Sequence, residues 1–220
     1  MATTNNLKLN VPAVPVLPIA TTAYSQQQQN QYTNTLRLYF NQLNGVVAAV
    51  VGNEGGQYLS FPYGAFQDNT TQTAAATSTP YAVKFGTTDL TNSVTVVTDG
   101  TNLTRVTVDE TGIYNFAFSL QLAKATANSK TAWIWPRING SNVADSATKV
   151  TLSGNGSAVV AAWNFFLSMS AGDYFQLMWA VEDTGIQIVH DAATAFCPEI
   201  PSAILTVNFI SVPPTNSSVV

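Results

Sequence analysis

Gly112-Ile-Tyr-Asn-Phe-Ala-Phe-Ser-Leu-Gln-Leu122 is the stretch that decides the fold. Large apolar side chains occupy every second position of it: Tyr114, Phe116, Phe118, Leu120 and Leu122. Small or polar side chains alternate with them: Asn115, Ala117, Ser119 and Gln121. Because successive side chains of a strand point to opposite faces, this alternation predicts a strand over 113–122 with one face buried.

Short apolar runs of the same kind lie on both sides of this strand. Turn-forming pairs separate them, namely Asp99-Gly100, Asn139-Gly140, Asn155-Gly156 and Gly172-Asp173. The further predicted strands are 81–85, 93–98, 103–108, 131–138, 149–152, 157–169, 173–181, 185–190 and 203–210. No segment after residue 45 has a helical period. The spacing is that of a β-sandwich.

Two of these strands are apolar on both faces. In 157–169 one face carries Val159, Ala161, Trp163, Phe165, Leu167 and Met169, and the other carries Val160, Ala162 and Phe166. In 173–181 the second face carries Tyr174, Gln176, Met178 and Ala180. A two-layer sandwich buries one face of each strand, so the second apolar face needs another cover, and a neighbouring subunit is the economical one.

The sequence before the sandwich has three parts. Residues 1–23 carry Pro12, Pro15 and Pro18, which favour an extended arm. Residues 24–44 have the spacing of an amphipathic helix, with Ser25 as N-cap and Gly45 as C-cap. Residues 45–78 are rich in Gly, Thr and Ala and predict a connector. The apolar stripe of the helix consists of Tyr32, Leu36, Tyr39, Phe40 and Leu43. It either packs on its own domain or associates with copies of itself; the second is favoured.

Composition excludes several classes of function. The chain has 220 residues, 8 Lys plus Arg, 12 Asp plus Glu and a net charge of −4. Only 9% of its residues are charged, whereas roughly 25% is usual. We therefore expect no nucleic acid as partner. No apolar run is long enough for membrane insertion, and the start of the chain does not have the pattern of a signal peptide. The single Cys197 cannot form an internal disulfide.

Five segments resemble one family in the same order. They are Gly112–Leu120, Trp135–Ser141, Val160–Phe166, Ser170–Trp179 and Pro201–Val207. The first resembles the G-x-Y-x-F strand of the trimeric jelly rolls, the tumour-necrosis-factor-like and complement-head-like domains. The set is most similar to the bacteriophage members of that group, which occur in virion structural proteins. The resemblance covers residues 79–211 and implies a trimer around a threefold axis.

The expected fold class is therefore mainly β. A C-terminal jelly-roll β-sandwich over 79–211 follows an extended N-terminal arm and one α-helix, and residues 212–220 form a tail. The expected interface of the trimer combines the helix stripe with the second faces of the two-faced strands: Tyr32, Leu36, Tyr39, Phe40, Leu43, Val160, Ala162, Phe166, Tyr174 and Met178.

Catalytic chemistry is weakly represented in the sequence. His190 is the only histidine, and its neighbours Asp191, Cys197 and Glu199 have no spacing typical of a metal site or a nucleophilic centre. We expect no enzyme, no cofactor and no metal. A glycan site is an open alternative, because Trp133, Trp135, Tyr174 and Trp179 supply flat aromatic faces.

The resemblance thus implies a non-enzymatic phage virion protein, located at the particle surface or tail and made in the host cytoplasm. It would be a trimeric appendage, a short tail fibre or spike with a receptor-binding head, held to other virion proteins by residues 1–44. A capsid decoration protein with the same jelly roll is the alternative. A lectin-like module that binds a host-surface glycan is the alternative of another class.

Overall fold

The computed structural model describes residues 12–19, 22–51 and 60–212. The chain divides into two compact units, 1–60 and 61–220.

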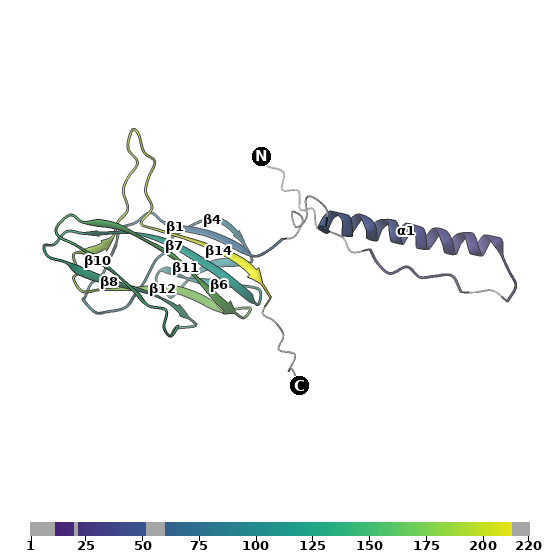
Figure 1. Cartoon of the computed structure of the whole chain (residues 1–220), viewed down its shortest axis with the longest axis horizontal. Coiled ribbons are helices and arrows are strands. Elements are labelled where there is room, and N and C mark those ends of the chain that lie inside the picture. Colours follow the sequence, from purple (N-terminus) through teal and green to yellow (C-terminus); the bar gives the residue numbers. More distant parts are fainter. Residues whose placement is uncertain (1–11, 20–21, 52–59, 213–220) are drawn as a thin grey trace. The chain divides into compact units, whose positions relative to one another are not determined.

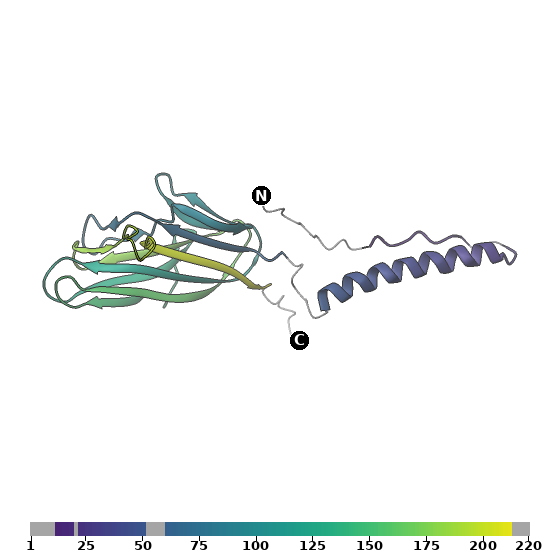
Figure 2. The ribbon, with the colours of Figure 1, turned by 90° about the horizontal axis from the view of Figure 1, so that it is seen from above.

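The second unit is a sandwich of two antiparallel sheets, a jelly roll as the sequence predicts (Figures 1 and 2). Sheet A has the strand order β2 (Gln72–Thr73), β13 (Ile186–Ile188), β7 (Gly112–Lys124), β14 (Ala203–Ser211), β1 (Tyr63–Asp68) and β4 (Thr87–Asn92), with β11 (Ala158–Met169) on the other side of β7. Sheet B has the order β10 (Thr148–Leu152), β8 (Lys130–Ile138), β12 (Tyr174–Val181), β6 (Leu103–Val108) and β5 (Val94–Thr98). Two short strands extend sheet B, β3 (Tyr81–Ala82) beside β12 and β9 (Ser141–Asn142) beside β8.

The core lies between the two sheets and is built on the strand that decides the fold. In β7, buried and half-buried residues alternate without a break from Gly112 to Lys124. The rings of Phe116 and Phe175 stack across the sheets with their centroids 4.3 Å apart. The predicted strand over 113–122 is therefore confirmed. The inward face of sheet A packs against sheet B of the same chain.

The sandwich begins earlier than predicted. The connector over 45–78 is wrong, because β1 and β2 lie within it and β1 pairs with both β14 and β4. Its inward positions are Gly64, Phe66 and Asp68, so only one of the three is apolar. A Cβ on Gly64 would lie 2.4 Å from the ring of Phe66, which explains the glycine. The predicted strands 81–85 and 185–190 are shorter here, and β4 was not predicted because its side chains are almost all exposed.

The described residues of the first unit form one helix and part of the arm. Helix α1 runs from Gln26 to Val51, so the predicted end at residue 44 is wrong. Gly45 lies inside the helix, and the half-buried Val46 and Val50 continue its apolar stripe past that glycine. Ser25 is the N-cap as predicted, since its Oγ accepts a hydrogen bond from the backbone N–H of Gln28 at 3.4 Å.

Residues 12–19 run back alongside α1 without helix or strand structure (Figures 1 and 2). The half-buried residues among them are Pro12, Pro15 and Pro18. A polyproline helix has three residues per turn, so this spacing turns one edge of the arm towards the helix. The side-chain amide of Gln28 donates a hydrogen bond to the carbonyl of Ile19. The arm is extended, as predicted, over its described residues.

Candidate self-association surface

The outer face of sheet A carries no ionisable side chain on three adjacent strands. Its outward residues on β7, β11 and β14 include Ile113, Asn115, Ala117, Ser119, Gln121, Ala123, Ala158, Val160, Ala162, Asn164, Phe166, Ser168, Ile204, Thr206 and Asn208. We call this set the uncharged face. A surface without charges loses little solvation when another surface covers it, so it suits a contact between protein chains.

Strand β11 forms the edge of this face. It pairs with β7 over its whole length, and no other described strand pairs with it. Its outward side chains include Phe166, which is 61% exposed, and Val160, which is 56% exposed. A long apolar edge strand with unpaired backbone groups is a template for contact with another chain, and monomeric proteins avoid it.

The inward side chains of β11 are only partly covered. Trp163 and Phe165 are half-buried, and the Trp163 ring packs edge-on against Phe118 with centroids 4.5 Å apart. A groove of about 460 Å³ lies beside them. It is lined by Val143, Asp145, Ser146, Thr148, Trp163, Asn164, Phe165, Phe166 and Leu167. The groove therefore reaches the uncharged face, because Asn164 and Phe166 of that face line it.

Amide side chains supply hydrogen-bonding groups in the middle of the face. Asn164 Nδ2 donates to Asn115 Oδ1 at 2.9 Å, and Asn208 lies opposite Asn115 in the register of β14 and β7. Each amide has more hydrogen-bonding capacity than this bond uses. The face can thus give a partner both apolar contact and directional polar contact.

The predicted interface residues of the two-faced strands do not form one surface. Val160, Ala162 and Phe166 lie on the uncharged face, but Tyr174 and Met178 point outward from sheet B, on the opposite side of the sandwich. The five residues do not share one face, because the consecutive strands β11 and β12 join different sheets, and their place in a trimer interface stays a prediction. Met178 is 3% exposed and lies between its register partners on β8 and β3, and Tyr174 is half-buried beneath the Arg105 guanidinium, 4.7 Å from the ring centroid.

The predicted helix residues lie along α1 in the first unit. Leu36, Tyr39 and Leu43 are half-buried, whereas Tyr32 and Phe40 are exposed. Positions 32, 36, 39, 43, 46 and 50 follow the alternating spacing of four and three of a heptad seam, and Phe40 lies beside that seam. Sequence reasoning stopped the seam at Gly45 and so missed Val46 and Val50.

The residues that could serve a metal site or a nucleophilic centre lie in one loop, and the tryptophans that could contact a glycan lie on strands of sheet B. His190 Nε2 lies 2.6 Å from Glu199 Oε1, and Cys197 is half-buried in the same loop. Over residues 12–19, 22–51 and 60–212, no group of three His, Cys, Asp or Glu side chains is arranged to hold a metal ion. Trp179 is 1% exposed and fills the core, so it cannot contact a glycan. Trp133 and Trp135 are half-buried on the outer side of sheet B.

No family model matches the sequence, and no curated protein is significantly similar to it. Many solved structures are similar in shape, among them the following two. Eiger TNF from S. frugiperda gives a TM-score of 0.47 at 10% identity, covering 73% of this chain and 99% of that chain. The globular domain of the zebrafish complement 1qA protein gives 0.41 at 13% identity, covering 69% and 99%. The fold class, a jelly-roll sandwich, rests on the strand topology described above.

No helix among the described residues has both the length and the apolar character needed to cross a membrane.

Proposed function

We propose that the chain is a non-enzymatic structural protein that assembles as a homotrimer through the uncharged face. The observation that carries this proposal is the combination of a charge-free sheet face with an unpaired, apolar, 12-residue edge strand. Burial of that surface would drive assembly with little dependence on salt. The number three comes from the resemblance of the sequence motifs to trimeric jelly rolls.

The virion role belongs to the same proposal. We propose a phage particle as the location, with residues 1–44 bound to other virion proteins and the sandwich as an outward head; a capsid decoration protein is the alternative. The motif resemblance alone supports this part. Mass spectrometry of purified particles tests it, since the chain must copurify with the particle in fixed proportion to a known capsid protein.

The trimer is tested by replacing Phe166 with Asp. An uncompensated buried charge costs about 3–5 kcal/mol, so we expect Phe166→Asp to give folded monomers where the wild type is a trimer by light scattering. The matched control is Val97→Asp, at an exposed apolar position on β5 of sheet B. A trimer that survives Phe166→Asp and dissociates with Val97→Asp would place the interface on the other sheet.

A lectin-like module is the second candidate. Trp135 Nε1 donates to Asn142 Oδ1 at 2.9 Å, and Arg137 Nε donates to the same oxygen at 3.1 Å. Half-buried indoles beside such polar groups are a surface on which a sugar ring could stack. Binding on a glycan array that Trp133→Ala abolishes, by a monomeric wild type, would favour this function over the trimer.

A further inference from the structure

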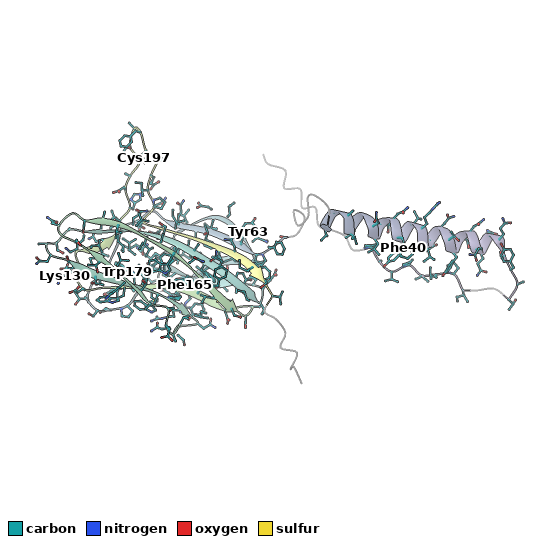
Figure 3. The ribbon with its side chains drawn as sticks, viewed as in Figure 1. Phe40, Tyr63, Lys130, Phe165, Trp179 and Cys197 are labelled. Atoms are coloured by element: carbon teal, nitrogen blue, oxygen red, sulfur yellow. The ribbon has the colours of Figure 1, made fainter. Side chains whose placement is uncertain are left out.

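Residues 189–202 join β13 to β14 and form a loop that projects from the sandwich. Figure 1 shows this loop rising away from the two sheets, and Cys197 lies on its raised part in Figure 3. Its base is held by backbone hydrogen bonds in both directions between Asp191 and Ile200, at 3.1 and 2.9 Å, and by the His190–Glu199 pair. The backbone N–H groups of Thr194 and Cys197 close a turn at its tip, at 2.8 and 3.1 Å. We call it the projecting loop.

The tip of the projecting loop is apolar and uncharged. It reads Ala-Ala-Thr-Ala-Phe-Cys-Pro over residues 192–198, and the Phe196 side chain is 91% exposed. When an apolar surface covers an aromatic side chain that a hydrogen-bonded loop holds in water, the free energy of the system falls. The chemistry of the tip therefore matches an apolar, uncharged partner surface.

The loop leaves the sandwich beside β7, next to Gln121 of the uncharged face. Leu120, Leu122 and Ala203 lie around the loop base and are buried in the core of the sandwich. The base lies level with one end of the edge strand. The backbone N–H of Val189 bonds to the carbonyl of Gln121 at 2.7 Å, and Val160 of β11 pairs with the same Gln121.

A hollow of about 320 Å³ lies beside the loop base, where the start of β11 pairs with the end of β7 and side chains of both faces line it. It is lined by Gln121, Leu122, Ala123, Ala158, Val159, Val160, Val189 and Asp191. This volume exceeds that of a phenyl ring, and most of the lining side chains are apolar. The projecting loop of the same chain stands at its margin, through Val189 and Asp191.

We propose that the projecting loop is exchanged within the trimer, so that Phe196 of each copy enters the hollow beside Val159 and Val160 of the next copy. This inference rests on the proposed trimer. A rotation about an axis along the strands keeps the loop and the hollow of the next copy at one level. Such head-to-tail contacts close into a ring when the rotation closes. Each filled hollow then contains Val159 and Val160 of one copy and Phe196 of its neighbour. The site is therefore complete only in the assembly.

Cys197, the single cysteine, makes the exchange testable in the full chain. The variant Val160→Cys is treated with a short bismaleimide, and we expect covalent dimers and trimers through Cys197 of one copy and the new cysteine of the next. Val97→Cys on sheet B and the wild type are the controls, and both are expected to stay uncross-linked. Absence of cross-linking in Val160→Cys while its mass remains trimeric would overturn the exchange.

A second variant measures the energy of the contact. Phe196→Ser is expected to raise the protein concentration at which half of the trimer dissociates by about tenfold or more. Ala193→Ser, in the same loop, is the control and should leave that concentration unchanged. An unchanged trimer after Phe196→Ser would overturn the exchange and leave the trimer intact, with the tip free for a molecule other than this chain. A monomeric wild type would overturn the proposed trimer as well.

Discussion

At the scale of single residues, Lys124 is the most unusual side chain of the core. It is 2% exposed, and its hydrogen-bond partners are the backbone carbonyls of Thr126, Ala127, Asn128 and Gly154. The ammonium group thereby ties two loops at one end of the sandwich to strand β7. Four carbonyls compensate for the solvation that this buried charge gives up.

We predict that Lys124→Met lowers the free energy of unfolding by about 3 kcal/mol. Methionine keeps the length of the side chain but leaves the four carbonyls without their donor, and unsatisfied buried groups cost about 1–3 kcal/mol each before relaxation. Urea unfolding followed by circular dichroism measures the loss. Lys149→Met, on an exposed position of β10, is the control. Equal losses in both variants would contradict a stabilising role of the four hydrogen bonds from Lys124 to backbone carbonyls.

Tyr114 predicts how the sandwich responds to alkali. The side chain is fully buried, and its hydroxyl donates to the Glu110 carbonyl at 2.7 Å. Burial, together with the nearby charges of Glu110 and Asp109, raises the pKa of Tyr114 to about 12. The protonated form is thus favoured by folding. Its contribution is fully present below about pH 10 and is lost as the pH rises towards 12.

We expect the free energy of unfolding to fall by roughly 2–3 kcal/mol from pH 10 to 12 through this group. Tyr114→Phe should cost about 1 kcal/mol at neutral pH and remove that part of the alkaline loss. The measurement is urea unfolding at a series of pH values, and Tyr63→Phe, at an exposed position, is the control. An alkaline loss of the same size in Tyr114→Phe would assign it to other groups.

At the scale of elements, the helix seam makes a prediction about assembly. Leu36 and Leu43 lie on the seam, whereas Leu38 is exposed on another side of α1. If copies of α1 associate, replacing both seam leucines by serine removes apolar area from each copy. We expect Leu36→Ser/Leu43→Ser to lower the midpoint of thermal dissociation of the trimer, because each buried leucine contributes about 1.5–3 kcal/mol. Leu38→Ser is the control; an equal effect of the control would contradict a seam and favour packing of α1 on its own arm alone.

The sequence predicted those strands whose inward positions are apolar. The strand over 103–108 has the predicted bounds, and β7, β8, β11 and β12 differ from the predicted ends by one or two residues. Strand β1 escaped prediction because two of its three inward positions are Gly64 and Asp68. The carboxylate of Asp68 accepts hydrogen bonds from the backbone N–H groups of Thr70 and Gly86, at 2.9 and 3.0 Å. A buried carboxylate satisfied by backbone donors leaves no apolar signal in the sequence.

The candidate surface was predictable only in part. Alternation shows that a strand has two apolar faces, and this located Val160 and Phe166 correctly as exposed apolar residues. It cannot show which sheet the strand joins. Met178 therefore resembled Phe166 in the sequence, although it is 3% exposed on an inner strand of sheet B and Phe166 lies on an edge strand. The projecting loop has no periodic pattern, so its exposed Phe196 carried no signal either.

At the scale of the whole molecule, the boundary between the two units decides which fragments can fold. A boundary at residue 79, the start of the sequence resemblance, would remove β1 and β2. Strand β1 connects β14 to β4 and places Phe66 in the core, where it is 1% exposed. The buried Ser202 also depends on β1, since its N–H and hydroxyl donate to the Asp68 carbonyl at 2.9 and 3.0 Å.

We therefore predict that a fragment of residues 61–220 unfolds cooperatively, with a thermal midpoint close to that of the full chain, and that a fragment of residues 79–220 shows no cooperative transition. Loss of Phe66 alone removes about 3–5 kcal/mol, a large part of the stability of an ordinary domain. Circular dichroism melting compares the two fragments. Light scattering on 61–220 then separates the two contributions to assembly: a trimer would show that the uncharged face suffices, whereas a monomer with an intact thermal transition would show that the helix seam is required. A cooperative transition in 79–220 would contradict the structural role of β1 and restore the later boundary.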